Sequence, residues 1–254
     1  MPESRPSDGR PSESPLRAAV LDAAALLLPV SCAGCGADDR ALCGACDAAL
    51  APAPRRRVLA DGIPAHAGLD YDGVAREVIV AMKSDRPGLA RRLAPALVAA
   101  IGAAVAEARR VGGDGALELC AVPATRRARR RRGYDPVRRT LAAGGYRVAR
   151  VFRAARPHPA QKTLSRAERA AHLAGVFAAR GALDGRRFVL VDDVVTTGAT
   201  LVAAADAVRA AGGEVLAYAA IASTPRRAGG FGGDAATTHR NRPGRSGDRG
   251  SAAG

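Results

Sequence analysis

Residues 188–201 read FVLVDDVVTTGATL, and this stretch decides the fold class of the 254-residue chain. Phe188–Val191 is a short apolar run of mostly branched side chains, which predicts a buried central strand. Two acids, Asp192 and Asp193, come directly after it, and residues 196–200 are small or hydroxyl-bearing. In open α/β sheets, ligands bind at the carboxyl ends of the strands. The stretch therefore predicts a strand, a ligand-binding loop and the start of a helix.

The loop after the two acids has the residues that a phosphate group needs. Small side chains and one glycine let the backbone turn tightly with its N–H groups directed inward, and the dipole of the following helix favours an anion. Threonine hydroxyls can donate further hydrogen bonds, while paired carboxylates can accept them from the vicinal hydroxyls of a ribose. A simple helix cap would explain one polar residue, but not two Asp, three Thr and a Gly. The candidate ligand-binding residues are Asp192, Asp193, Thr196, Thr197, Gly198, Ala199 and Thr200.

Strand-like and helix-like segments follow one another between the two tails, and they alternate in the second half of the chain. Predicted strands cover His66–Tyr71, Leu117–Val122 and Val215–Ala222, and predicted helices cover Val74–Met82, Leu89–Arg110, Arg166–Arg180 and Thr200–Ala211. Pro95 is expected to bend the second of these helices or to start it anew. Residues 52–57 are interpreted as a linker. The alternation predicts an α/β fold with a mostly parallel sheet and helices on both faces.

Residues 125–136, TRRARRRRGYDP, form a predicted loop with six arginines within seven positions. Guanidinium groups bind phosphate oxygens through two parallel hydrogen bonds, and a loop after a second strand could direct them at the ligand. The candidates for binding a pyrophosphate or another polyanion are Arg129, Arg130, Arg131 and Arg132. Because six arginines cannot all contact one pyrophosphate, some are expected to face solvent or to bind a polyanion such as single-stranded DNA.

Four cysteines lie within fifteen residues near the N-terminus, as Cys32-x2-Cys35 and Cys43-x2-Cys46. Each pair can direct two sulfurs at one ion, and two pairs complete a tetrahedral four-cysteine site, which predicts structural zinc. An iron–sulfur cluster and a pair of disulfides remain open as alternatives. Because all four ligands would be thiolates, no coordination position is left for catalysis. The fifth cysteine, Cys120, lies in an apolar segment and is expected in the core.

The composition indicates which binding partners, domain bounds and location to expect. The formal net charge of +15 indicates affinity for polyanions, but only two of the 39 basic residues are lysines, so local arginine clusters carry more weight. Residues 1–15 and the basic tail 226–254 are expected to be disordered. Residues 16–57 should form a helix, the cysteine unit and a linker, and residues 58–225 a ligand-binding domain. The apolar run Val20–Val30 is too short to span a membrane, which favours a cytoplasmic protein.

The stretch VLVDDVVTTGAT, residues 189–200, resembles the signature of type I phosphoribosyltransferases, which bind 5-phosphoribosyl-1-pyrophosphate (PRPP) together with Mg²⁺. The resemblance implies that residues 58–225 form a type I phosphoribosyltransferase-like domain. It also implies that Asp192 and Asp193 contact the ribose 2- and 3-hydroxyls at the catalytic centre, and that residues 196–200 hold the 5-phosphate. The implied activity is transfer of phosphoribose to an acceptor, although no acceptor pocket is identifiable in the sequence.

The order of the motifs resembles the ComF (competence protein FC) family. The N-terminal cysteine unit is followed first by VPATRRARRRRGYDP (122–136), then by QKTLSRAERAAHLAGVF (161–177), and last by VLVDDVVTTGAT (189–200). The family's usual asparagine in the second block is His172 here, and its earlier Leu-Lys motif corresponds to Met82 and Lys83, which makes Lys83 a further candidate phosphate contact. The resemblance implies a role in DNA uptake during natural transformation, with single-stranded DNA or a competence helicase as partners. The alternative function is a non-catalytic accessory protein that retains the ribose-phosphate site.

Overall fold

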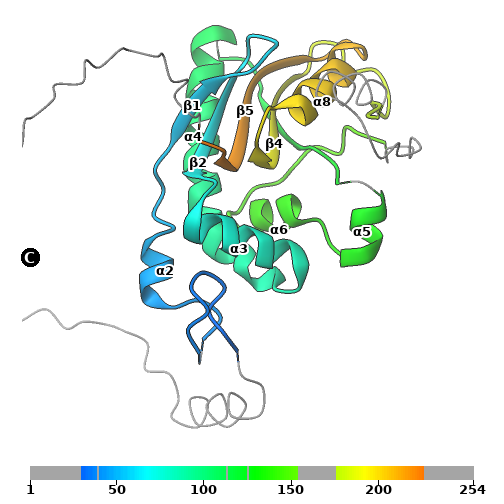
Figure 1. Cartoon of the computed structure of the whole chain (residues 1–254). Coiled ribbons are helices and arrows are strands. Elements are labelled where there is room, and N and C mark those ends of the chain that lie inside the picture. Colours follow the sequence, from blue (N-terminus) through cyan, green and yellow to red (C-terminus); the bar gives the residue numbers. More distant parts are fainter. Residues whose placement is uncertain (1–29, 39, 113, 125, 154–175, 226–254) are drawn as a thin grey trace, which may run out of the picture.

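The computed structural model describes residues 30–38, 40–112, 114–124, 126–153 and 176–225. Both expected disordered tails, His172 and nearly all of the helix expected at Val20–Val30 lie outside the described residues, as does most of the helix expected at Arg166–Arg180. The described chain contains a five-stranded sheet in the order β1-β2-β5-β4-β3 (Figure 1). The strands are β1 (Arg55–Val58), β2 (Pro64–Asp70), β3 (Glu118–Ala121), β4 (Arg187–Val195) and β5 (Glu214–Ser223).

The sheet is mostly parallel, as the alternating pattern predicts. β2, β5, β4 and β3 run in one direction, and the edge strand β1 is antiparallel to β2. β4 is longer than its apolar run, because Val194 and Val195 continue the pairing with Ala222 and Ser223. The two acids therefore lie within the last residues of β4 rather than after its end.

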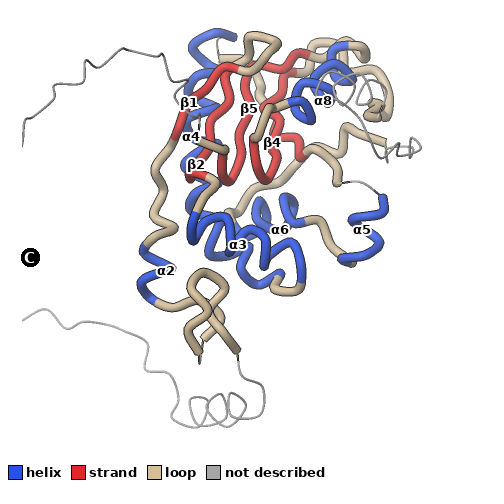
Figure 2. The backbone as a smooth tube through the Cα atoms, viewed as in Figure 1, coloured by secondary structure: helices blue, strands red, loops and turns tan. Residues whose placement is uncertain are grey.

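Helices cover both faces of the sheet, which confirms the predicted fold class (Figure 2). On one face, α3 (Gly73–Ser84), α4 (Ala90–Gly112) and α6 (Pro136–Ala143) form a core with side chains such as Val78, Leu97 and Ile221. On the other face, α8 (Ala199–Arg209) packs with Phe188 and Tyr218. Cys120, on β3, is fully buried in this second core, as expected. The shorter helices are α2 (Gly44–Ala48), η1 (Pro87–Leu89) and α5 (Arg126–Arg132).

Helix α4 runs from Ala90 to Gly112 through Pro95, so the helix does not start anew at this residue. Pro95 is exposed. Its missing N–H group deprives the carbonyl oxygen of Arg91 of a hydrogen bond, but Arg91 is the second residue of α4, so the loss falls in the first turn of the helix. By length and composition alone, Pro87–Gly112 could cross a membrane, with 26 residues and a mean hydropathy of 1.5. Half of its most apolar 18-residue stretch is buried in the fold, however. A helix in the core of a soluble protein can have the same length and hydropathy.

Three other segments differ from the sequence-based expectations. Residues 55–57, expected in a linker, belong to β1, whose three arginines hide the apolar alternation of a strand. The arginine-rich segment, expected to be a loop, forms helix α5, which agrees with the high helix propensity of arginine. Residues 176–180, expected to be helical, are not, because Ala179 forms an antiparallel bridge with Phe152.

Gly68, in the middle of β2, allows the sheet to approach α4 closely. A Cβ at this position would overlap the backbone carbonyl group of Ala96. Neither backbone can move away without disturbing a close-packed face. We expect Gly68→Ala to lower the free energy of unfolding by about 2–4 kcal/mol, measured by urea denaturation.

The matched control for this change is Gly102→Ala. Gly102 is exposed within α4 and has open space around its Cα. The added methyl group should stabilise the helix by about 0.5–1 kcal/mol. An unfolding midpoint that does not fall in Gly68→Ala would contradict the close contact between β2 and α4.

Candidate functional site

The two acids of β4 lie at the carboxyl end of the parallel sheet, and one of them, Asp193, pairs with a lysine from α3. The backbone N–H group of Asp193 donates to Asp192 Oδ1 over 2.8 Å. Lys83 Nζ, in the last turn of α3, lies 2.8 Å from Asp193 Oδ1. The arrowheads of β4 and β5 point toward the end of the sheet where α3, α5 and α6 lie (Figure 1). The fold therefore brings Lys83, more than a hundred residues away in sequence, to the acidic pair.

Asp192 lies in surroundings that disfavour its charge. Burial, and then the neighbouring Asp193 carboxylate, raise the pKa of Asp192 to about 7, although the Asp193 N–H group and the Lys83 ammonium oppose the shift. Asp135, at the N-terminus of α6, adds to the increase in this pKa. Carboxyl groups with pKa values raised by burial and by like charge are common at functional sites.

Residues 196–200 turn from β4 into α8 around a glycine in the left-handed conformation. Gly198 has a φ of 82° and is the N-cap of α8, and other residues rarely adopt that conformation. Leu59 packs directly on Gly198, since a Cβ there would lie 2.5 Å from Leu59 Cδ1. Thr197 Oγ1 accepts a hydrogen bond of 3.3 Å from the N–H group of Ala199. The side chains of Thr196, Thr197 and Thr200 are exposed, and are therefore accessible to a ligand.

Arg57 on β1 supports this loop, a role that local sequence patterns do not reveal. Its Nη1 donates to the carbonyl oxygen of Thr196 over 2.8 Å, although β2 and β5 separate β1 from β4 in the sheet. The Thr224 hydroxyl donates to the same oxygen over 3.4 Å. The loop is thus fixed both by its own sequence neighbours and by a side chain from the far edge of the sheet.

We expect Arg57→Ala to weaken binding of ribose 5-phosphate about three- to tenfold, because the loop loses one charge-assisted hydrogen bond. Calorimetric titration of both proteins measures the change. Arg55→Ala is the control, since Arg55 lies on the same strand and pairs with Asp70 instead of the loop. An equal loss of affinity in the two variants would show a general effect of charge rather than a positioning role for Arg57.

A cavity of about 290 Å³ opens beside the two acids. Its polar lining includes Asp192, Asp193, Thr200, Asp135 and Arg132. Its apolar lining includes Val122, Pro123, Val176 and Phe177. A few polar groups converging on a mainly apolar cavity are typical of small-molecule sites. The sequence does not reveal this cavity because its walls come from segments that are far apart along the chain.

The structure separates the four candidate arginines of α5. Arg132 lines the cavity, and its Nε atom is buried with no hydrogen-bond partner among the described residues. Arg129 lines a second, adjoining cavity. Arg130 and Arg131 are exposed and line neither of these two cavities. Among the described residues, the cations that the fold brings to the acidic pair and its cavity are therefore Lys83 and Arg132.

The strand, loop and helix of this site fall within a region that matches a known family. Residues 146–229 match the phosphoribosyl transferase domain. The phosphoribosyl transferase domain match contains β4, α8 and β5, and with them both acids and residues 196–200. A search of curated proteins found no match to the chain. The match supports the type I phosphoribosyltransferase resemblance, whereas the ComF resemblance rests on the order of the motifs.

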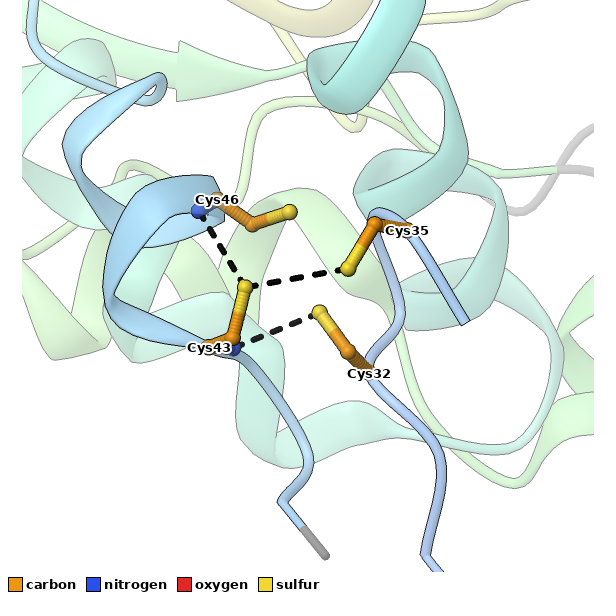
Figure 3. Close-up of side chains that lie close together, drawn as sticks. All are labelled: Cys32, Cys35, Cys43 and Cys46. Carbon is orange, nitrogen blue, oxygen red and sulfur yellow. Dashed lines mark hydrogen bonds between the residues drawn. The ribbon is translucent and has the colours of Figure 1, made fainter. Parts of the chain in front are cut away.

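Ahead of the phosphoribosyl transferase domain, the four cysteines converge on one point (Figure 3). The sulfur atoms of Cys32, Cys35, Cys43 and Cys46 all lie within 4.8 Å of one another, and those of Cys35 and Cys43 are 3.7 Å apart. A tetrahedron with Zn–S bonds of about 2.3 Å has sulfur–sulfur edges of about 3.8 Å. All four are free thiols, with no disulfide between them. The donor set and its spacing fit one zinc ion.

Backbone N–H groups stabilise the thiolate form of Cys32, whereas burial and the neighbouring cysteines raise the pKa of Cys46 to about 12. The N–H group of Cys43 donates to Cys32 Sγ over 3.3 Å, and that of Cys46 to Cys43 Sγ over 3.5 Å. Burial would raise the pKa of Cys32, but the N–H groups of Cys43, Cys35 and Gly34 lower it to about 6. The thiolate is the form that binds a metal ion.

The cysteine unit packs against α3 and α4, two of the helices that cover the sheet. A Cβ on Gly34 would lie 2.7 Å from Cys46 Sγ and 2.9 Å from Val74 Cγ1 of α3. The Arg92 guanidinium of α4 lies 3.2 Å from Asp47 Oδ2. These contacts make the unit part of the same folded body.

Proposed function

We propose that the protein binds PRPP with Mg²⁺ at the sheet edge formed by β4 and α8, and transfers its phosphoribosyl group to an acceptor. One observation carries the proposal. Asp192 and Asp193, followed by a loop suited to phosphate, lie beside a partly apolar cavity within the matched phosphoribosyl transferase domain. The acids and loop suit the ribose and its 5-phosphate, and the cavity offers space for an acceptor.

Each group has a role that follows from its chemistry. Asp192 and Asp193 accept hydrogen bonds from the ribose 2- and 3-hydroxyls and orient C1 of the sugar. The backbone N–H groups and threonine hydroxyls of residues 196–200 bind the 5-phosphate at the start of α8. Lys83 and Arg132 bind the pyrophosphate and stabilise the negative charge that develops on it as its bond to C1 breaks.

Magnesium fits this arrangement. Mg²⁺ prefers oxygen ligands and is held in proteins by one or two carboxylates together with the phosphates of a substrate. The carboxylates that line the cavity are Asp135, Asp192 and Asp193, and these residues would hold the ion with PRPP. When bound, the ion would neutralise charge on the leaving pyrophosphate.

The ComF resemblance extends the proposal to DNA uptake by a cytoplasmic protein. The alternative is a non-catalytic accessory protein that binds single-stranded DNA or a competence helicase and retains the ribose-phosphate site. The exposure of Arg130 and Arg131 outside both cavities favours this alternative. Exposed arginines can neutralise the phosphates of a nucleic-acid strand.

The test combines binding and turnover on the same protein. We expect calorimetry to show saturable PRPP binding that requires added magnesium, and a screen of bases and amines to show pyrophosphate release with at least one acceptor. Single-stranded DNA binding is measured in parallel. PRPP binding without turnover, together with DNA binding, would favour the accessory role. No PRPP binding at any magnesium concentration would contradict the proposed transferase.

A further inference from the structure

A second cavity, of about 300 Å³, adjoins the cavity beside the acidic pair. The two cavities share Pro123, Ala124 and Asp135 in their linings. The second differs in character, because five arginines contribute to its walls. These are Arg129, Arg138, Arg150, Arg153 and Arg180.

Three separate parts of the fold supply these arginines. Arg129 lies on α5 and Arg138 on α6. Arg150 and Arg153 flank Val151 and Phe152, a segment that pairs with residues 178–180. The N–H group of Arg153 donates to the Ala178 carbonyl oxygen, and that of Arg180 to the Val151 carbonyl oxygen, each over 2.8 Å. Arg180 Nε also donates to the Phe152 carbonyl oxygen over 2.9 Å, so the backbone holds this part of the cavity in place.

The residues that the structure describes do not balance the positive charge of this cavity. Among its lining residues, Asp135 is the single carboxylate, and its Oδ2 lies 3.9 Å from Arg138 Nε. Its Oδ1 already accepts a hydrogen bond from the Arg138 backbone N–H group. Arg129, Arg150 and Arg153 make no ion pair with any described carboxylate. Like charges gathered around a small cavity repel one another, and a bound anion relieves this repulsion.

We propose that this arginine cavity binds an anionic group, a phosphate or a carboxylate, of the acceptor substrate. The inference rests on the proposed transferase function and adds the chemical class of its second substrate. The body of such an acceptor would lie in the first cavity, beside Val122 and Phe177, while its anionic group extends into the second. The nucleophilic atom of the acceptor then forms its bond to C1 of the ribose as the bond from C1 to pyrophosphate breaks. The electron pair of that bond leaves with pyrophosphate, and the proton of the acceptor passes to solvent.

The cavity favours a small acceptor over a nucleic-acid strand. Its volume of about 300 Å³ is at the lower end for sites that enclose small molecules. Besides the arginines, the walls include Phe152, Pro123 and Ala124. A strand is instead followed along its backbone by an open basic groove with stacking aromatic side chains. The small volume and the shared wall with the first cavity both favour one compact ligand that occupies the two.

The test uses inorganic phosphate as a probe, with ribose 5-phosphate present at saturation to occupy the loop of residues 196–200. We expect Arg150→Gln/Arg153→Gln to bind phosphate at least about tenfold more weakly, since two charge-assisted contacts are lost. The affinity of the same variant for magnesium-bound PRPP should stay within about threefold of wild type. The control is Arg91→Gln/Arg109→Gln, which removes the same charge from exposed positions on α4 and should change neither affinity.

The outcomes distinguish the proposal from its competitors. Unchanged phosphate binding in Arg150→Gln/Arg153→Gln would overturn it, and Arg129→Gln serves as a second variant in case the first unfolds. An equal loss of PRPP affinity would assign the arginines to the pyrophosphate of the donor instead. A loss confined to a deoxythymidine oligonucleotide would assign them to a nucleic-acid surface. If wild type binds no PRPP while arginine-dependent phosphate binding persists, the proposed function fails but the anion site remains.

Discussion

The Asp192→Asn/Asp193→Asn variant is expected to bind magnesium-bound PRPP at least about 100-fold more weakly than wild type. Each carboxylate is proposed to accept a hydrogen bond from a ribose hydroxyl, and such bonds to charged groups contribute about 1.5–3 kcal/mol each. Two of them correspond to at least the 2.7 kcal/mol or so that a 100-fold change represents. The amide replacements keep the size of the side chains but remove the negative charge that the magnesium complex needs. Calorimetry at constant magnesium concentration measures the loss.

The single variant Asp192→Asn should also be more stable than wild type at neutral and alkaline pH. The pKa of Asp192 in the folded protein is about 7, above its ordinary value of 3.8, so ionising this group opposes folding. The free energy of unfolding therefore falls as the pH rises from about 4 to about 7, and remains lower above that range. The full shift of about three pH units corresponds to about 4 kcal/mol. Partial exposure of the side chain reduces the expected gain in Asp192→Asn to about 1–3 kcal/mol at pH 8.

The pH dependence provides the control within the same protein. At pH 4 the carboxyl group of Asp192 is protonated in the folded state, so Asp192→Asn should change the free energy of unfolding little. Asp72→Asn/Asp114→Asn is a further control, because both acids are exposed, and neither stability nor PRPP affinity should change. A stability that falls in Asp192→Asn at pH 8 would show that the carboxylate supports the fold. A double variant that keeps its PRPP affinity would remove the proposed role of the acidic pair.

The sequence predicts the central elements of the fold because their signals are local. Each of these elements is specified by neighbouring residues alone. The strand is indicated by the apolar run before Asp192, the turn by the small residues around Gly198, and the helix by the apolar segment that ends at Gly212. The structure confirms β4, α8 and β5 close to the expected bounds. The edge strand β1 is missed because an edge strand is largely exposed and can carry arginines, so that its side chains do not alternate between apolar and polar.

The parts of the site that the sequence does not predict depend on contacts between distant segments. Arg57 reaches Thr196 across 139 positions of sequence, and nothing near Arg57 indicates this contact. Outside the site, His66 on β2 shows the same limit, because its Nε2 lies 2.7 Å from Glu107 Oε2 on α4. Arg56 on β1 pairs with the same carboxylate. The arginine cavity combines α5, α6 and the paired segments around Phe152 and Arg180. Counting charges along the chain shows that arginines are abundant, but only the fold shows which of them meet.

Loss of zinc is expected to unfold the cysteine unit while the sheet stays folded. In small zinc units held by four cysteines, the metal–thiolate bonds supply most of the folding free energy, on the order of 10 kcal/mol. Cys46 is buried, and its sulfur contacts Gly34, which in turn packs on Val74 of α3. We expect Cys46→Ser to lose the ion and to lower the protection of backbone amides in residues 31–50 from hydrogen exchange by at least about 100-fold. The amides of β4 and β5 should keep their protection, since both strands lie in the sheet core.

Cys120→Ala is the matched control, because Cys120 is also a buried free thiol but lies in the core beside β4, outside the cysteine cluster. Elemental analysis should find about one zinc per chain in wild type and in Cys120→Ala, and much less in Cys46→Ser. An iron–sulfur cluster would be recognised by iron in the same analysis and by visible absorbance. A wild-type protein that is folded over residues 31–50 without any metal would contradict the assignment of the four cysteines as metal ligands. Equal metal loss in Cys46→Ser and Cys120→Ala would show that general destabilisation of the fold, and not ligation by Cys46, releases the ion.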